Sequence, residues 1–388
     1  MTRAALRPLL IALALRLLAV FAFDADVADV ARYGRVARHL LDESWNPYSI
    51  ERLYPYPPPW AAVEAAALWL AREGVLSFAI NVKLPVVAAD LGIVALLARA
   101  AAGGLASPLA AWLYALHPVS ILIGGAHGQF DAIPVGLLLL SVLLAERGRA
   151  DASALALGAG IATKSFPVLA LPFLAFAGGA TWRSALRYAA IALAPGALLL
   201  IPFAVADAAA LRRELFGYGG IADFGWTGVA RGIDWLASGS LARSEARFWP
   251  VAALVSKLAF LGAWAALVLA VRARRLELPP RRAVLALLLT FAVLYGLQSA
   301  QYLLWVVPFG LLRPDKAAGV HAAAASVGLV GFYLFLAPGV LAPGLEAQAL
   351  TLAGGAWLLG AAATLLVCAV WLVSVLREGR LAYLHPGV

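Results

Sequence analysis

The sequence contains, at residues 76–98, the stretch LSFAINVKLPVVAADLGIVALLA, in which Lys83 and Asp90 are the only ionisable residues. A helix of roughly 20 apolar residues crosses the hydrocarbon core of a bilayer, so this stretch is long enough to span a membrane. Lys83 and Asp90 fall on one helix face, about 10 Å apart along the axis. Ionisable groups inside a span commonly face the bundle interior and serve function, whereas a lysine can also extend to the membrane surface.

Comparable apolar runs recur along the whole chain, which is 63% hydrophobic and 13% charged, with mean hydropathy +0.88. Soluble domains carry about 25% charged residues, so the composition predicts an all-α, polytopic transmembrane bundle that forms a single membrane domain over residues 1–388. The first run contains Arg16 and lacks a small-residue cleavage site, so it is expected to remain as a helix. About 12 crossings are expected, near residues 8–23, 76–98, 107–126, 131–146, 151–163, 165–178, 185–205, 249–272, 282–298, 301–312, 317–337 and 348–376.

Basic residues gather in short clusters between the apolar runs, which accounts for the net charge of +9 without a nucleic-acid-binding face. Loops rich in Lys and Arg stay in the cytoplasm, and this rule places both termini inside if residues 60–71 form a re-entrant or surface-lying helix. The polar and Pro/Gly-rich segments then share the outer face, with a first outer loop at residues 24–75 and a second at 206–248. A lone cysteine, Cys368, allows no intrachain disulfide.

Three aspartates, Asp24, Asp26 and Asp29, follow the first helix, and no basic residue precedes Arg32 there. Closely spaced carboxylates raise one another's pKa, so this cluster can supply a general base. The pair Asp24 and Asp26 can also bind a divalent cation, Mg²⁺ or Mn²⁺, because both ions favour oxygen ligands. Any single aspartate can instead cap the helix that follows.

The rest of the first outer loop combines an amphipathic stretch with an aromatic, proline-rich one. Apolar residues from Val30 to Leu41 recur at helical intervals, so this stretch is expected to lie along the membrane interface. The segment Tyr54–Pro59 reads YPYPPP, which excludes a regular helix. Its aromatic rings suit either membrane anchoring or the stacking of a sugar.

A compact polar turn, His127-Gly-Gln129-Phe-Asp131, joins two apolar runs on the expected outer side. Its imidazole, amide and carboxylate suit a sugar or a phosphate, whereas a metal site needs three or four ligands. Lys164, at the outer end of a short hairpin, is a natural counter-charge for a phosphate.

Two candidates lie farther along the chain. Arg231 belongs to the segment Gly217–Trp235, which is rich in glycine and aromatic residues and is expected to be a flexible loop over the substrate. Gln301 stands at a helix break, where its amide can bind hydroxyl groups or join two helices.

In their order and their common side, these segments resemble the glycosyltransferase-C superfamily of multi-spanning enzymes that use polyprenyl- or dolichyl-phosphate sugars. The nearest resemblance is to family-87-like mannosyltransferases of prokaryotes and to the GPI-anchor mannosyltransferase. It implies that one of Asp24, Asp26 and Asp29 is the catalytic base. It also implies a donor site in which His127, Lys164 and Arg231 contact the phosphate, and to which we add Lys83, Gln129, Asp131 and Gln301.

The implied activity is the transfer of a hexose, preferably mannose, from a polyprenyl-phosphate-sugar donor to a lipid-linked or glycan acceptor at the outer face of the plasma membrane. A carboxylate takes the proton of the acceptor hydroxyl, while cations stabilise the leaving lipid phosphate. A transporter or flippase of lipid-linked sugars is the alternative, although transporters usually show internal repeats and midplane sites. A non-catalytic membrane subunit is the third hypothesis, and it predicts dispensable aspartates.

Overall fold

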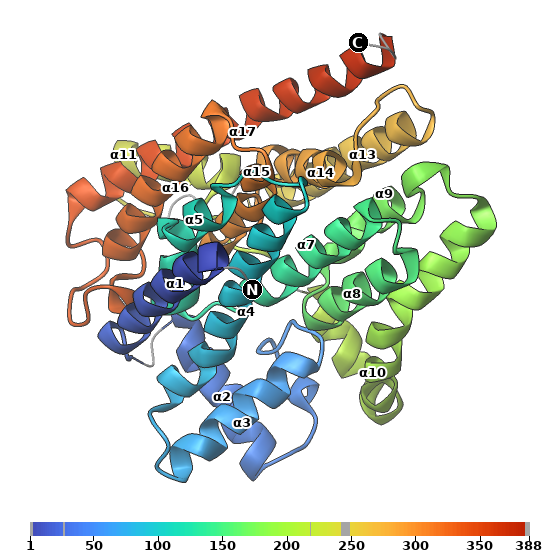
Figure 1. The fold of residues 1–388 in the computed structure, drawn as a ribbon. Coiled ribbons are helices and arrows are strands. Elements are labelled where there is room, and N and C mark those ends of the chain that lie inside the picture. Colours follow the sequence, from blue (N-terminus) through green and yellow to red (C-terminus); the bar gives the residue numbers. More distant parts are fainter. Residues whose placement is uncertain (1–2, 26–27, 218, 242–248, 385–388) are drawn as a thin grey trace. The chain divides into compact units, whose positions relative to one another are not determined.

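The computed structural model describes residues 3–25, 28–217, 219–241 and 249–384, and every regular element within these ranges is a helix (Figure 1). The prediction of an all-α fold is therefore confirmed for this part of the chain. Packing divides the chain into two compact units, Met1–Tyr218 and Gly219–Val388. The single membrane domain over residues 1–388 stays a prediction.

Helix α4 (Phe78–Ala102) lies at the centre of the first unit and packs against α1 (Arg3–Ala22) and α7 (Ala132–Glu146) (Figure 1). Its N-cap Ser77 accepts a hydrogen bond from the Ile80 amide, and 56% of its most apolar window is buried. The unit also contains α2 (Ala28–Asp42), α3 (Pro59–Arg72), α5 (Ala110–Ala115), α6 (Pro118–Ser120), α8 (Ala150–Thr163), α9 (Leu171–Ala175), α10 (Trp182–Gly217) and the short turns η1 (Pro47–Ser49), η2 (Ile121–His127), η3 (Phe166–Ala170) and η4 (Ala177–Gly179).

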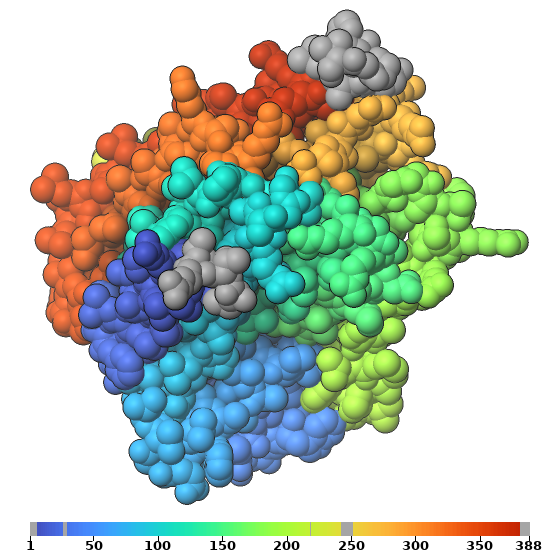
Figure 2. Space-filling model, in the orientation of Figure 1, coloured from blue at the N-terminus to red at the C-terminus, as the bar shows by residue number. Residues whose placement is uncertain are grey.

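Helices α2 and α3 pack against each other at one end of the first unit, shown in blue in Figures 1 and 2. The helical periodicity of α2 is confirmed, because Val30, Tyr33 and Val36 are buried while the arginines between them are partly or fully exposed. Helix α3 begins at Pro59, the last residue of the proline run. A proline fits the first helical position because its missing amide hydrogen costs no hydrogen bond there. Residues 59–72 thus form a short helix, and its re-entrant or interfacial placement stays a prediction.

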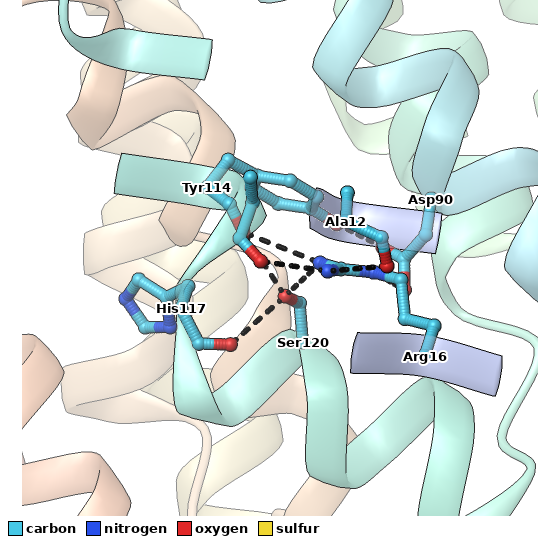
Figure 3. Close-up of polar contacts among 7 residues, drawn as sticks. Ala12, Arg16, Asp90, Tyr114, His117 and Ser120 are labelled. Atoms are coloured by element: carbon cyan, nitrogen blue, oxygen red, sulfur yellow. Dashed lines mark hydrogen bonds and ion pairs between the residues drawn. The ribbon is translucent and has the colours of Figure 1, made fainter. Parts of the chain in front are cut away.

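The apolar run at residues 107–126 is broken rather than continuous. Pro118 has no amide hydrogen and pushes His117 into an extended conformation, so α5 ends and the chain restarts as α6 and the π-helical turn η2. The break leaves the Ala115 carbonyl without a backbone donor among the described residues, while the Tyr114 carbonyl accepts from the His117 amide at 3.1 Å. These carbonyls accept hydrogen bonds from Arg16 of α1, at 3.2 and 2.8 Å (Figure 3).

Arg16 makes this break stable in an apolar environment. The guanidinium is fully buried, lies 3.2 Å from the Asp90 carboxylate and donates to Ser120 Oγ at 2.7 Å. Tyr114 donates its hydroxyl to the same carboxylate (Figure 3). A buried charge is tolerated only when it is paired and its remaining polar atoms are satisfied, and this network meets both conditions.

The second unit is built around two long helices, α16 (Lys316–Phe335) and α17 (Thr351–Leu384), which pack closely along each other. Their contact uses glycines, because a Cβ placed on Gly360 would lie 2.2 Å from the backbone of Gly328. Such small residues let the backbones of membrane helices approach. The unit also contains α11 (Gly225–Ser238), α13 (Trp249–Arg272), α14 (Pro280–Leu294), α15 (Val307–Leu312), η5 (Ala300–Leu304) and η6 (Pro338–Val340).

Five helices in the described part of the chain are long and apolar enough to cross a membrane: Phe78–Ala102, Trp182–Gly217, Val251–Arg272, Lys316–Phe335 and Thr351–Arg380. Helix α10 shows the character of a lipid-facing span, because only 11% of its apolar window is buried and its leucines and valines are exposed. Helices also form at the other expected crossings: α1 has 20 residues, and the others are shorter or broken. The number of about 12 crossings therefore stays a prediction.

The expectation of a flexible loop over Gly217–Trp235 is wrong for most of its length. Helix α10 continues to Gly217, and Gly225–Ser238 forms the helix α11. Gly225 has φ +67°, a conformation that glycine adopts without strain, and it sets the start of α11 directly after the Phe224–Gln298 bridge. The glycines of this segment therefore begin a helix and pack against neighbours. Within the expected second outer loop, residues 242–248 lie outside the described residues.

Candidate active site

Asp29 lies in the first turn of α2, where the helix dipole favours a negative charge. His127 Nε2 lies 3.1 Å from its Oδ2 atom, and Gln129 donates its amide to the same oxygen. Within the described residues no contact falls on Oδ1, and the Asp29 side chain is 26% exposed. The described hydrogen bond and ion pair therefore both hold Oδ2, and the side chain remains partly exposed.

The backbone conformation of the predicted polar turn, residues 127–131, allows it to supply both partners of Asp29. The π-helical turn η2 ends at His127, and Gly128 follows with φ +82°, which reverses the chain so that His127 and Gln129 both reach Asp29. A Cβ on Gly128 would lie 3.0 Å from the Lys83 side chain. The site therefore needs glycine at this position for conformation and for space.

Tyr33, one turn after Asp29 on α2, donates its hydroxyl to Gln129 Oε1 at 3.1 Å. Gln129 thus joins two residues of α2 to the turn and can adopt only the amide orientation that donates to Asp29. Tyr33 is a residue that the sequence did not single out. Its spacing to Asp29 is the ordinary spacing of neighbours on a helix, so only the structure reveals its role.

Electrostatics keep Asp29 ionised. Burial raises the pKa of its carboxyl, but the contact and charge of His127, with Arg32 and Gln129, lower the pKa more, so the net value lies below that of an ordinary aspartate. A low pKa favours the deprotonated form that a general base requires. The like-charge interaction expected among the three aspartates is not the dominant influence on Asp29.

Asp131 and Lys164 form a second pair, 2.7 Å apart, with side chains 0% and 9% exposed. The Lys164 ammonium also lies 4.9 Å from the centre of the Phe130 ring and 5.3 Å from that of Tyr56. Such cation–π contacts are attractive and become stronger when water is excluded. Lys164 is thus oriented by one acid and two rings, with most of its surface covered.

Aromatic rings from the first outer loop pack beside this pair. Trp60 stacks on Phe130 with ring centres 4.3 Å apart, and Tyr33 meets Trp60 edge-on at 5.6 Å. Tyr56 meets Phe130 edge-on at 4.9 Å. The proline-rich segment therefore contributes its rings to the polar site, whereas its role as a membrane anchor or a sugar platform stays a prediction.

Glu64 of α3 lies fully buried near these rings, and neither of its carboxyl oxygens makes a hydrogen bond within the described residues. Burial raises the pKa of Glu64 well above its ordinary value, against a smaller lowering by the Trp60 indole. Burial therefore favours the protonated form of this acid. Its position inside an otherwise apolar helix gave no signal in the sequence.

The other members of the aspartate cluster lie apart from His127. Asp24 is exposed and accepts a 2.5 Å hydrogen bond from Ser77, so it joins the end of α1 to the start of α4. Asp26 lies outside the described residues. The described part of the chain gathers no group of three His, Cys, Asp or Glu side chains that could hold a metal ion.

Lys83 and Asp90 have different partners although both lie on α4. Lys83 is fully buried and donates to the Phe23 carbonyl at 2.7 Å, so it does not extend to the membrane surface. Asp90 belongs to the Arg16 network (Figure 3). The structure thus uses Asp90 to stabilise the bundle and Lys83 to hold the end of α1 beside Gly128.

The remaining two candidates belong to the second unit. Arg231 of α11 lies 3.6 Å from Asp223, and both side chains are mostly buried. Gln301 is buried in η5. Gln298, three residues earlier, donates its side-chain amide to the carbonyls of Ala292 and Tyr295. These hydrogen bonds complete the end of α14.

A comparison with protein families bears directly on this arrangement. Residues 34–180 match the model of the MptA_B family, described as alpha-(1->6)-mannopyranosyltransferase, N-terminal domain. The chain is a membrane glycosyltransferase. The match supports the resemblance to glycosyltransferase-C mannosyltransferases, and it includes the turn at His127 and the Asp131–Lys164 pair. No curated protein matches this glycosyltransferase in sequence.

Proposed function

We propose that this glycosyltransferase moves mannose from a polyprenyl-phosphate donor to a glycan or lipid acceptor at the outer membrane face, with Asp29 as the general base. The observation that carries the proposal is the Asp29 carboxylate, which is ionised, partly exposed and held from one side by His127 and Gln129. Asp24 lies apart from His127 and Gln129, and its described partner is the hydroxyl of Ser77.

In the proposed reaction the acceptor hydroxyl approaches the open Oδ1 atom of Asp29 and transfers its proton to it. The acceptor oxygen attacks the anomeric carbon as that proton leaves, and the bond from this carbon to the phosphate oxygen breaks. The lipid phosphate departs with the electron pair. A low pKa reduces the driving force for proton transfer, but it keeps the base in its active form, and hydrogen-bond reach is the first requirement.

Lys164, as a cation, and His127, through its imidazole, are the groups of the first unit that we assign to the leaving phosphate. Both are already oriented by carboxylates, so little reorganisation is needed when negative charge develops, and preorganised charges of this kind contribute most to catalysis. Phosphate binding would require Lys164 to share its ammonium with Asp131. We assign Arg231 a donor contact from the second unit on the resemblance alone.

The test is sugar transfer from radiolabelled polyprenyl-phosphate mannose in membranes that contain the wild type, Asp29→Asn or Asp24→Asn. We expect Asp29→Asn to lose roughly 10²–10⁴-fold in rate, the usual contribution of a general base. Asp24→Asn removes the same charge nearby and serves as the matched control, which should retain most activity. A fully active Asp29→Asn variant at normal protein level would refute the assigned base.

A further inference from the structure

A basic cleft of about 520 Å³ runs along helix α2 within the first unit. Three arginines of α2 line it, Arg32, Arg35 and Arg38, and their three-residue spacing places them on one side of the helix. Arg52, from the segment that follows η1, lines it from across the cleft. We call this feature the arginine cleft. It is separate from the Asp131–Lys164 pair assigned to the donor.

The arginine cleft carries an excess of positive charge. Within the described residues, none of its four arginines forms a salt bridge. Asp42 pairs at 2.6 Å with Arg72, which lies outside the cleft lining, whereas Glu43 pairs at 2.7 Å with His39, which lines the same cleft. Glu51 is the remaining acid of the cleft.

Anion binding explains this row of arginines better than a role in setting the membrane topology. Lysines and arginines concentrate in cytoplasmic loops, so a row of arginines on the expected outer loop runs against the general bias. A guanidinium matches the geometry of phosphate with two parallel hydrogen bonds. A concave site with several guanidinium groups therefore fits a phosphate group.

We propose that the arginine cleft binds a phosphate group carried by the acceptor, an inference that rests on the proposed function. Arg32 lies one turn after Asp29 on α2, and Arg38 lies about 14 Å from Asp29 along the helix axis. Arg35 and Arg38 are turned by about 120° and 180° from Asp29 around the helix, so the sugar that joins a phosphate there to the base must pass around α2. The acceptor of this enzyme is then an anionic, phosphorylated lipid or glycan, and its phosphate fixes the position of the attacking hydroxyl.

The test measures binding of two probes to the purified full chain in detergent by calorimetry at low salt. Inorganic pyrophosphate represents the free phosphate group, and dihexanoyl phosphatidylglycerol represents an ordinary membrane headgroup. Arg35→Gln combined with Arg38→Gln removes two exposed cations of the cleft and leaves Arg32, beside Asp29, in place. The matched control combines Arg183→Gln with Arg187→Gln, which removes two exposed arginines of α10 outside the cleft lining.

We expect the cleft variant to bind pyrophosphate roughly ten-fold more weakly, since a hydrogen bond to a charged group contributes about this factor. The control should stay within roughly two-fold, because exposed pairs contribute little. Equal weakening in both variants would overturn the proposal, as it would show a general charge effect. Cleft-dependent binding of phosphatidylglycerol without binding of pyrophosphate would overturn it in favour of a membrane headgroup.

The same variants separate this inference from the assignment of the base. Asp29→Asn should abolish transfer and bind pyrophosphate within roughly two-fold of the wild type, because it lies outside the cleft lining. An active Asp29→Asn variant with normal pyrophosphate binding refutes the base and with it the acceptor assignment. An inactive Asp29→Asn variant, combined with a cleft variant that binds pyrophosphate normally, refutes the cleft alone.

Discussion

At the scale of single residues, the pairing of Asp29 with His127 sets the pH at which the proposed base works. A carboxylate with a lowered pKa stays ionised until the pH falls through that lowered value. The acid limb of kcat/KM should therefore lie below the range near pH 4 in which a free aspartate titrates. Removing the imidazole removes the principal lowering influence on the Asp29 pKa.

His127→Gln should shift the acid limb of kcat/KM to higher pH, since burial then raises the Asp29 pKa with less opposition. The measurement is the pH profile of transfer in membranes for the wild type and the variant. Ser77→Ala, which removes the partner of Asp24, is the control and should leave the limb in place. An acid limb that stays at the same pH in His127→Gln would show that a group other than Asp29 determines it.

The sequence predicted the chemical type of these residues better than their partners. Asp29, His127, Gln129 and Lys164 were singled out because polar groups next to apolar runs are costly without a function. The sequence left the choice among the three aspartates open, because it depends on the reversal at Gly128. Tyr33 gave no separate signal, since it resembles an ordinary member of its helix, whereas Arg16 and Glu64 are ionisable residues in apolar runs whose surroundings only the structure reveals.

At the scale of elements, the broken segment from α5 to η2 depends on close packing against α4. A Cβ on Gly124 would lie 2.8 Å from Asp90 Oδ2, so a methyl group there would displace the carboxylate from Arg16. Overpacking of this kind usually costs about 1–3 kcal/mol. Gly92 of α4 is the matched position, because a Cβ there would meet no atom within 4 Å.

Gly124→Ala should lower the midpoint of thermal unfolding in detergent, whereas Gly92→Ala should leave it unchanged or raise it slightly, as alanine favours a helix by about 0.8–1 kcal/mol over glycine. Fluorescence of the purified protein with a thiol-reactive or tryptophan readout follows the transition. Equal midpoints for the two variants would show that the Arg16–Asp90 network does not depend on the space at Gly124.

Element boundaries were predictable where a simple periodicity holds and not where backbone breaks decide them. The repeat of apolar residues along α2 and the proline at the start of α3 were sufficient to place both helices. The crossing expected at residues 107–126 ignored the consequence of Pro118. The glycines of residues 217–235 indicated a loop, because a sequence does not show whether a glycine serves flexibility or close packing.

At the scale of the whole molecule, the placement of residues 24–75 on the outer face decides where transfer occurs. We expect a membrane-impermeant maleimide to label a cysteine at Glu73 in intact cells and not one at Arg147, since both side chains are exposed but belong to opposite expected sides. The background is Cys368→Ser, in which the single buried thiol is removed.

Permeabilised cells provide the control, because both introduced cysteines should then react to a similar extent. Labelling of position 147 alone in intact cells would place the first loop in the cytoplasm and would contradict an outer active site. The composition was sufficient to predict a helical membrane protein. It could not fix the crossing number, because short and broken apolar helices span or stay buried according to their neighbours.

The Arg16 network also constrains the order in which the chain is assembled. Arg16 belongs to α1, yet Asp90 follows it by 74 residues in the chain and the carbonyls of Tyr114 and Ala115 by 98 and 99. A central arginine costs roughly 2.5–3.5 kcal/mol on insertion by the translocon. Stable insertion of α1 is therefore coupled to translation of the segment through Ser120. Helix α1 is therefore complete well before the last partner of Arg16, Ser120, has been synthesised.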